Sequence, residues 1–450
     1  MTTTKNNEHK KLNFSSEREQ SQACLNSAEH EKNQGRKVLN VPNKREQNQT
    51  CLDSAEREGL RPKGNVPTLR FPEFQGEWEK CKVSDLLDFY STNSLSWDKL
   101  EYGTTNIQNL HYGLIHVGLS TMVDLDKDNL PNIIDGNVPK NYELCKEGDI
   151  VFADASEDTN EVAKAVEYYN LNGKKVVCGL HTIHGRDNKN KTVVGYKGYA
   201  FSSMSFHHQI RRIAQGTKIY SINSKNFSEC YVGIPSKDEQ QKIADLLRLI
   251  DERIATQNKI IDKLQTLIKG ISSRIFTSIQ GIEYRMGDIV TITNGNSNVQ
   301  DAVTQSKDGV YPFFDRSEDI KYLPTFLFDK EAIIYPGEGT EFMPRYFKGK
   351  FALHQRCYAI FDFNEIINAR FLYFYLKTRN SYFVKNAVGS TVPSLRLDTF
   401  QKLKVIIPPK KIQHSVSLCL SFMELKCNVE KKILHKLLKQ KQYLLRQMFI

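Results

Sequence analysis

The residues of this chain that could carry out chemistry lack the companions that catalysis needs. An enzyme that methylates adenine takes the base out of the duplex and grips it with an Asn/Asp-Pro-Pro-aromatic element. The single Pro-Pro pair here lies between Ile407 and Lys410. The run Gly337-Glu-Gly-Thr340 stops short of the G-x-G-x-x-G pattern and is typical of a turn. The sequence therefore carries no complete signature of a methyltransferase or a dinucleotide-binding enzyme.

Metal-dependent chemistry is also weakly supported. The nine cysteines include no C-x-x-C pair, so neither a zinc cluster nor a disulfide framework is expected. Glu161 and Lys164, beside an acidic cluster at 156–158, contain the residue types of the E-x-K arrangement of nucleases. That arrangement requires a strand, whereas the segment around Glu161 and Lys164 resembles a helix. The histidines that could ligate a metal have no cysteine or carboxylate at ligand spacing, and they are His181, His184, His207 and His208. We expect no metal site, and a self-contained DNA-modifying or DNA-cleaving enzyme is the alternative interpretation.

Basic residues form two clusters that suit a nucleic acid. The chain has 63 Lys and Arg against 52 Asp and Glu, a net charge of +11 and a pI near 9.0, which favours a polyanionic partner. Arginine can bond guanine edges and glutamine adenine edges, whereas lysine mainly neutralises phosphate. The predicted DNA-binding residues of the first cluster are Lys174, Lys175, Arg186, Lys189, Lys191, Arg211 and Arg212. Those of the second, interleaved with aromatic residues, are Arg345, Lys348, Lys350, Gln355 and Arg356.

The elements that must position these clusters occur twice. The segment 216–227 returns as 389–400, and Val232-Gly-Ile-Pro235 returns as Val405-Ile-Ile-Pro408, in each case 173 residues later. The same step relates Phe276 to Phe449. Upstream the two copies resemble each other faintly, and the second is about 30 residues shorter. The duplication predicts a pseudo-twofold molecule with two unlike readers, which implies an asymmetric target.

A long helix follows each copy. Ser236 and Glu239 have the spacing of a capping box, and apolar residues then alternate four and three apart, as in a coiled coil. The predicted first seam includes Ile243, Leu247, Ile250, Ile254, Gln257, Ile261 and Leu264. The predicted second seam includes Leu420, Met423, Glu430, Leu434 and Leu437. Antiparallel pairing would bring the polar Gln257 and Glu430 into one zone; alternatively, each helix packs on its own domain.

The remaining segments set limits on the class of protein. Residues 1–65 contain a polar tandem repeat, 18–29 and 45–56, that buries too little apolar surface to fold, so we expect a disordered or marginally helical tail. No apolar run approaches the roughly 18 residues of a membrane span, and no signal-peptide core is visible. We therefore expect a cytoplasmic protein with no membrane partner.

Several segments together resemble the specificity subunit of type I restriction-modification systems. They are Val66–Trp78, Gly148–Phe152, the turns at Gly216 and Gly389, and the helix entry Ile234–Gln240. The resemblance spans about 66–450. The tail departs from the family pattern, and so does the second helix entry, Pro408–Gln413, which lacks the glutamate of the first.

The resemblance implies an α/β fold with two target recognition domains in a pseudo-twofold arrangement, separated by an antiparallel coiled-coil pair of long conserved-region helices. The expected domains are the tail 1–65, a first recognition domain 66–235, a first helix 236–280, a second recognition domain 281–408 and a second helix 409–450. The implied function is to read a bipartite, asymmetric double-stranded DNA target without chemistry of its own.

The same resemblance implies partner subunits. Two methyltransferase (modification) subunits would methylate adenine, and restriction/translocase subunits would cleave DNA. No cofactor would be bound by this chain, and S-adenosylmethionine, ATP and Mg²⁺ would act in the partners. A coiled-coil scaffold that binds only proteins is a further alternative.

Overall fold

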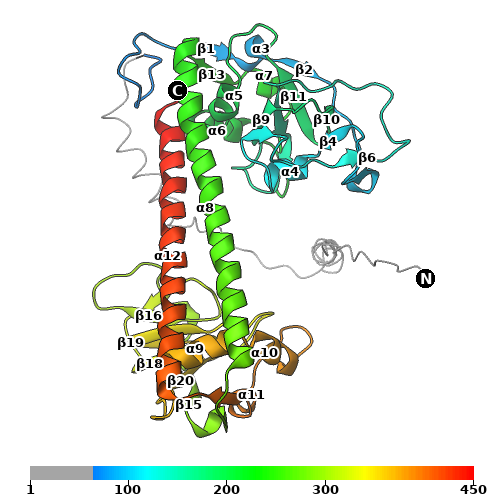
Figure 1. Ribbon diagram of the computed structural model, residues 1–450. Helices are drawn as coiled ribbons and strands as arrows, with labels where there is room; N and C mark the ends of the chain where they lie inside the picture. Colours follow the sequence, from blue (N-terminus) through cyan, green and yellow to red (C-terminus); the bar gives the residue numbers. More distant parts are fainter. Residues whose placement is uncertain (1–63) are drawn as a thin grey trace, which may run out of the picture. The chain divides into compact units, whose positions relative to one another are not determined.

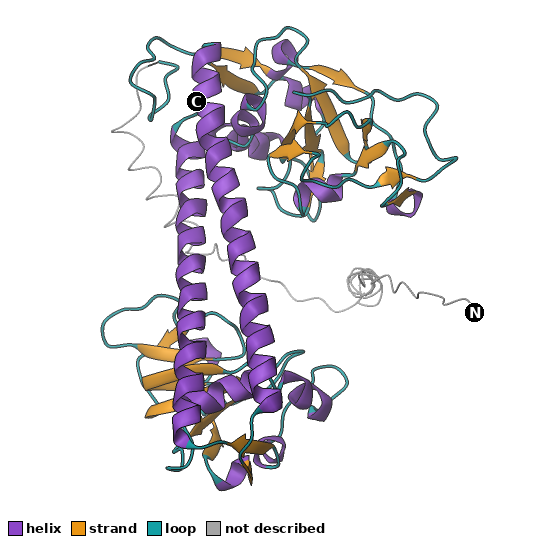
Figure 2. Cartoon of the chain, in the orientation of Figure 1, coloured by secondary structure: helices purple, strands orange, loops and turns teal. Residues whose placement is uncertain are grey.

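The computed structural model describes residues 64–450, and the expected tail falls almost entirely outside this range. The described residues form an α/β unit with two long helices, α8 (Lys237–Ser278) and α12 (Lys410–Gln447), that run side by side, with β-strands gathered toward either end of the pair (Figures 1 and 2). No helix among residues 64–450 is both long and apolar enough to cross a membrane.

The first domain contains a five-stranded sheet of order β2-β11-β7-β9-β5 and a four-stranded sheet of order β10-β4-β6-β3. Strand β7 is buried along its whole length, which explains its unbroken apolar sequence IVFA. The strands are β1 (Glu79–Lys82), β2 (Asp88–Tyr90), β3 (Leu100–Glu101), β4 (Gln108–Leu110), β5 (Met122–Asp124), β6 (Asn132–Ile133), β7 (Ile150–Ala153), β8 (Ala155–Ser156), β9 (Ala165–Asn170), β10 (Val176–Cys178), β11 (Thr182–Arg186), β12 (Tyr220–Ser221) and β13 (Tyr231–Ile234). The helices are α3 (Val83–Leu86), α4 (Tyr112–His116), α5 (Tyr196–Phe201), α6 (Met204–Ile213) and α7 (Ser224–Ser228).

The second domain is built on one six-stranded sheet of order β15-β20-β18-β19-β16-β17. Its strands β18 and β20 pair antiparallel and are buried where they meet, which places the core under the carboxyl half of β18. The strands are β14 (Ile282–Arg285), β15 (Thr291–Asn294), β16 (Tyr311–Phe314), β17 (Lys321–Leu323), β18 (Phe328–Pro336), β19 (Arg345–Leu353), β20 (Cys357–Phe361) and β21 (Lys404–Ile407). The helices are α9 (Ala369–Lys377), α10 (Asn380–Asn386) and α11 (Leu397–Gln401).

Helices α8 and α12 form the antiparallel pair expected from the heptads. The amino-terminal part of α8 shares a core with the carboxyl end of α12 and the first domain, and the opposite ends share a core with the second domain. The seam residues Ile243, Leu247, Ile250, Ile261, Leu420 and Leu437 are buried, and Ile254, Leu264, Met423 and Leu434 are half-buried. The alternative, in which each helix packs only on its own domain, is therefore wrong.

The polar residues of the two seams meet. Gln257 Nε2 donates hydrogen bonds to Glu430 Oε2 at 2.5 Å and to the Glu430 carbonyl at 3.2 Å, and both side chains are buried. Lys426 adds an ion pair to Glu430 from the solvent side. The hydrogen bond from Lys426, followed by the one from Gln257, lowers the pKa of Glu430 and keeps it ionised. This polar layer fixes one register of the pair because a slip would leave both groups unpaired.

The start of α8 corrects one local expectation. The Ser236 hydroxyl caps the helix by accepting from the Glu239 amide, as a capping box requires. The Glu239 carboxylate does not return to Ser236, however, because Arg70 holds it with two hydrogen bonds of 2.7 Å. Glu239 therefore ties the segment before β1 to the helix.

The internal duplication is repeated in buried polar contacts. Gln240 at the start of α8 donates to the carbonyl of Pro235, and Gln413 at the start of α12 donates to the carbonyl of Pro408. Each also accepts from a loop amide of its own domain, at Val193 and at Asn368. In both copies this glutamine fastens the domain to its helix. It explains why an amide recurs at this step in the sequence.

Candidate nucleic-acid interface

The two domains present equivalent edges that are closed by main-chain hydrogen bonds. In the first domain, the amide of Asp154 donates to the carbonyl of His181, and the amide of Ile222 donates to the carbonyl of Asp154. In the second, Gly337 donates to the carbonyl of Arg356, and Leu395 donates to the carbonyl of Gly337. Each edge also contains a turn closed by a two-way amide–carbonyl pair, at 215–221 and at 388–394. We call these the first and second recognition edges.

The second recognition edge displays Gln355 and Arg356 on a clamped turn. The Gln355 amide donates to Ser297 at 3.2 Å, and the Gln355 carbonyl accepts from Asn294 Nδ2 at 3.2 Å. The Arg356 guanidinium is 63% exposed and forms an ion pair with Glu338 of the same edge. A fixed backbone with an exposed amide and an exposed planar donor fork is suited to base edges.

The first recognition edge carries His181 where the second carries Arg356. His181 has a φ of 55°, its side chain is 51% exposed, and its Nδ1 lies 3.2 Å from Asp154 Oδ1. Tyr112 packs edge-on against the His181 ring at 5.3 Å. Sequence analysis did not select His181 as a contact, because the equivalence with Arg356 is visible only in the hydrogen-bond frame. His181 contacts Asp154, the counterpart of Gly337 in this frame, whereas Arg356 pairs with Glu338, the next residue along the chain.

Arg186 does not fit its predicted role as a DNA contact. It is buried and bonds Asp149 through Nε and Nη2, each at 2.8 Å, while Nη1 bonds Glu143 at 2.6 Å. Its guanidinium also lies 4.4 Å from the centre of the Tyr90 ring. The hydrogen bond to Asp149 raises the pKa of Arg186 against the effect of burial. The positive charge of Arg186 is thus paired with carboxylates inside the domain.

The other predicted residues of the first domain divide by exposure. Lys174 is half-buried and donates to the carbonyl of Leu125 at 2.7 Å, and Lys191 is half-buried in an ion pair with Glu79 at 2.6 Å. The residues that remain exposed are Lys175, Lys189, Arg211 and Arg212, of which Lys189 donates to the carbonyl of Asp85 and Arg211 to Asn160. The seven residues therefore differ in exposure and in the partners that their side chains already have.

The predicted residues of the second domain lie on β19 and on the second recognition edge. Lys348 and Lys350 are exposed on β19, beside the recognition edge in sequence. Arg345 differs, because its guanidinium donates to the carbonyls of Ser317, at 2.8 Å, and of Asp315. Burial lowers the pKa of Arg345. Arg345 supports the loop at 315–320, whereas Lys350 is exposed and its ammonium lies 4.9 Å from the centre of the Phe326 ring.

The residues weighed for catalysis have structural roles. Lys164 forms an ion pair with Glu161 at 2.8 Å in a turn, and Ala163 between them has a φ of 57°, so the helix expected here is absent. Gly337 and Glu338 belong to the second recognition edge. His207 is half-buried on α6, and burial lowers its pKa. The Glu161–Lys164 pair and Glu338 are thus engaged with neighbouring groups of their own domains.

Comparison with known proteins agrees with the duplication. The family model "type I restriction modification DNA specificity domain" matches residues 76–266 and again 282–439. The specificity subunit of the type I restriction enzyme EcoDI from Escherichia coli is 30% identical over 27% of this chain and 26% of its own length. The putative type I restriction enzyme MjaX specificity subunit from Methanocaldococcus jannaschii is 25% identical over 47% of this chain, and the alignment spans about half the length of that relative, 48%.

Solved structures share the fold. The S subunit of a type I restriction-modification system from M. genitalium superposes with a TM-score of 0.59 at 17% identity, over 86% of this chain and 99% of that one. A chain from a structure of complex assembly in a type I R-M system gives a TM-score of 0.50 at 11% identity, over 83% and 97%. Because the family model matches both halves, the chain belongs to the family of type I restriction modification DNA specificity domains.

Proposed function

We propose that the chain is the non-catalytic specificity subunit of a type I restriction-modification complex and that it reads a bipartite, asymmetric sequence in double-stranded DNA. The observation that supports this most strongly is the pair of recognition edges, which share one main-chain frame and carry unlike side chains. Because the two recognition edges share one main-chain frame, their side chains would be presented in the same way, and because those side chains differ, they would select different bases. Each edge would read one half of the target.

Contacts within the proposed interface divide into two kinds. Gln355, Arg356 and His181 stand on the recognition edges and would meet base edges. The exposed Lys175, Arg211, Arg212, Lys348 and Lys350 would neutralise phosphates and supply binding that does not depend on sequence. This division separates specificity from affinity.

The proposed partners are two modification subunits, together with restriction/translocase subunits. An apolar stripe on α12 supports a docking role: Leu418, Phe422, Leu425 and Val429 are 43–62% exposed. Each follows a seam residue by two positions and so lies about 200° from the seam, on the far side of α12. A stripe of this length on a helix fits an amphipathic helix of another subunit.

The equivalent face of α8 is different in character. The residues 173 positions earlier are Asp245, Leu249, Glu252 and Thr256, and Arg248 forms ion pairs with Asp245 and Glu252 there. A second modification subunit that docked at this place would meet a mainly charged surface. S-adenosylmethionine, ATP and Mg²⁺ would act in the partner subunits, where the proposed adenine methylation and DNA cleavage take place.

Methylome sequencing tests the proposal. Cells that express the modification subunits with and without this chain are compared, and we expect a bipartite methylated adenine motif only when the chain is present. The purified chain with S-adenosylmethionine should methylate nothing. Methylation or cleavage by the chain alone would support the enzyme alternative, and binding to partner subunits without any DNA shift would support the scaffold alternative.

The docking surface is tested by a matched pair of leucines. Leu425, 58% exposed in the apolar stripe, and Leu267, 51% exposed on α8, are each replaced by Glu. Leu425→Glu should reduce binding of a modification subunit at least tenfold, because it places a charge in an apolar contact, whereas Leu267→Glu should leave binding unchanged. Equal effects in a pull-down titration would exclude the stripe as the docking site.

A further inference from the structure

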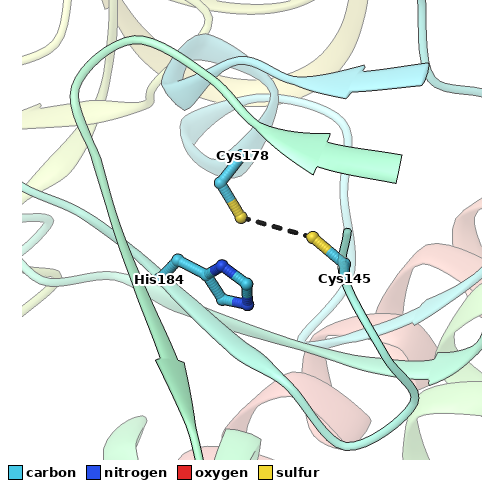
Figure 3. A group of neighbouring side chains, drawn as sticks. All are labelled: Cys145, Cys178 and His184. Carbon is cyan, nitrogen blue, oxygen red and sulfur yellow. Dashed lines mark hydrogen bonds between the residues drawn. The ribbon is translucent and has the colours of Figure 1, made fainter. Parts of the chain in front are cut away.

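Three buried side chains in the first domain turn their ligand atoms toward one point. Cys145 lies before β7, Cys178 ends β10 and His184 lies in β11, and their ligand atoms are all within 4.8 Å of one another. The two sulfur atoms are 3.5 Å apart, with the His184 ring beside them (Figure 3). The side chains of Cys145, Cys178 and His184 are 6%, 2% and 0% exposed. The group is therefore shielded from water.

The hydrogen bonds of His184 leave one ring nitrogen for a ligand. Nε2 lies 2.7 Å from Asp149 Oδ2, and Arg186 holds that carboxylate from the other side. With Nε2–H donating to Asp149, the lone pair of the neutral ring lies on Nδ1, which is buried and has no hydrogen-bond partner in the described chain. Histidines that bind metals usually donate their second nitrogen to a carboxylate in this way. Tyr90 packs on the ring at 5.4 Å and fixes its orientation.

The spacing suits a metal better than a disulfide. Two thiolates at ~2.3 Å from a tetrahedral zinc are about 3.8 Å apart, near the 3.5 Å observed here, whereas a disulfide requires about 2.05 Å. A disulfide would also leave the Nδ1 of His184 unpaired. The Tyr168 hydroxyl is a second buried polar atom without a hydrogen-bond partner in residues 64–450. Tyr168 packs in the same buried cluster as Cys145 and Cys178.

We propose that Cys145, Cys178 and His184 bind a structural zinc ion, with the Tyr168 hydroxyl at the fourth position. Two thiolates balance the charge of Zn²⁺, and the Asp149–Arg186 pair is balanced separately, so the buried site is neutral. The ion would join β10 to β11 directly below the turn 179–181, which carries His181 on the first recognition edge. The zinc site would thus stabilise the first recognition edge and would take no part in catalysis.

The test measures the metal in the full chain. The chain is purified with its thiols reduced and without chelators, and we expect one zinc per chain by elemental analysis. Replacement of zinc by Co²⁺ should give the intense near-ultraviolet absorption of thiolate-to-cobalt charge transfer. Cys178→Ser should lose bound zinc and most of this absorption. Cys357→Ser is the matched control, because Cys357 is an equally buried thiol in the second domain.

The cobalt spectrum of the unmutated chain keeps the proposal open to refutation even if Cys178→Ser does not fold. No stoichiometric zinc and no charge-transfer absorption in the unmutated reduced chain would overturn it. Retention of zinc by folded Cys178→Ser would do the same, as would peptide mapping that finds a Cys145–Cys178 disulfide in the chain as isolated. A spectrum lost in Cys178→Ser and kept in Cys357→Ser would establish the site.

Discussion

Arg356 and His181 occupy corresponding positions, so each should control one half-site. Arg356→Ala removes an exposed bidentate donor and should relax base preference in one half-site by ~1–3 kcal/mol. His181→Ala should relax the other half-site. Binding selection from a random duplex library, with the partner subunits present, measures both. A change of both half-sites by either substitution would contradict the assignment of one edge to each half.

The control for this experiment is a residue expected to meet phosphate. Lys348→Ala on the exposed face of β19 should weaken binding to all sequences and reduce the slope of log affinity against log salt by up to about one unit. Glu338→Gln is a second control, because it removes the ion-pair partner of Arg356 and keeps the guanidinium. A changed sequence preference in Lys348→Ala would show that the two kinds of contact are inverted.

His111 gives the first domain a pH-dependent stability. Burial, with a smaller effect of His181, lowers the pKa of His111 to about 4, below the ordinary value of about 6.5. Between these values the unfolded chain binds more protons than the folded one, so the free energy of unfolding falls as pH falls from about 6.5 to about 4. At pH 5 the loss should be about 1–2 kcal/mol.

His111→Asn separates titration from structure. The neutral His111 Nδ1 accepts from the Gly113 amide at 3.2 Å and caps α4, and Asn is an equally good cap. Urea denaturation at pH 7 and pH 5 should therefore show a smaller difference in this variant than in the unmutated chain. An unchanged difference would assign the pH dependence to other groups.

Single residues were the least predictable level. The sequence identified basic residues by their number and spacing, but it could not show which of them already had partners. The Arg186 guanidinium is hydrogen-bonded to Asp149, and that of Arg345 is hydrogen-bonded to backbone carbonyls. The Arg356 side chain, by contrast, is exposed. The cluster of Cys145, Cys178 and His184 was missed because Cys145 lies 33 residues before Cys178 and the three residues match no metal-binding motif.

At the scale of elements, the polar layer formed by Gln257 and Glu430 should lower the stability of the helix pair while restricting the pair to one alignment. Gln257→Leu removes the donor to Glu430 and leaves a buried carboxylate with less support, so it should lower the midpoint of thermal unfolding. The double variant Gln257→Leu with Glu430→Leu should unfold at a higher temperature than the single variant, because apolar pairs replace a desolvated polar pair. Thermal unfolding followed by circular dichroism measures both.

The register is the second readout of that experiment. Crosslinks between cysteines placed on the two helices should form in one alignment in the unmutated chain and in more than one alignment in the double variant. A double variant less stable than Gln257→Leu would show that the layer contributes net stability rather than specificity.

Long periodic elements were the most predictable. The heptads predicted the length and the pairing of α8 and α12, because a seam of this length has few other ways to be buried, and the family resemblance implied the antiparallel direction. Short strands of two to four residues, such as β3, β8 and β12, were not predicted. Their pairing depends on contacts distant in sequence, which local patterns do not encode.

For the whole molecule, the helix pair should set the spacing between the two half-sites. One heptad inserted into both helices, at equivalent places between Ile254 and Ile261 and between Cys427 and Leu434, keeps the seam in register and adds about 10 Å. Since one base pair rises about 3.4 Å, the spacer of the target should lengthen by about three base pairs. Methylome sequencing of the variant with its partner subunits measures the spacer directly.

A four-residue insertion within Ile254–Ile271 of α8 alone is the control. It adds roughly 6 Å to one helix but rotates its seam out of register with α12, so it should weaken or abolish binding rather than shift the spacer cleanly. An unchanged spacer in the heptad variant would show that another part of the complex fixes the distance.

The duplication made the arrangement of the whole molecule predictable. The strand order of the sheets could not be predicted from it. Two copies of one module with a helix each imply a pseudo-twofold, and buried contacts such as those of Gln240 and Gln413 repeat it atom for atom. The sheets between the repeated segments differ, with five and four strands in one domain and six in the other. Their sequences have diverged too far for the common frame to be recognised.

The main-chain closure of the recognition edges bears on how such proteins evolve. The bonds from Asp154 to His181 and from Gly337 to Arg356 join amides to carbonyls, so replacing the side chains at 181 and 356 does not break them. Under the proposed function, substitutions at these two positions should therefore change the bases that are read with little effect on the free energy of unfolding. Because each domain is fastened to its helix by the same glutamine contact, exchange of one entire domain should give a new combination of half-sites in one step.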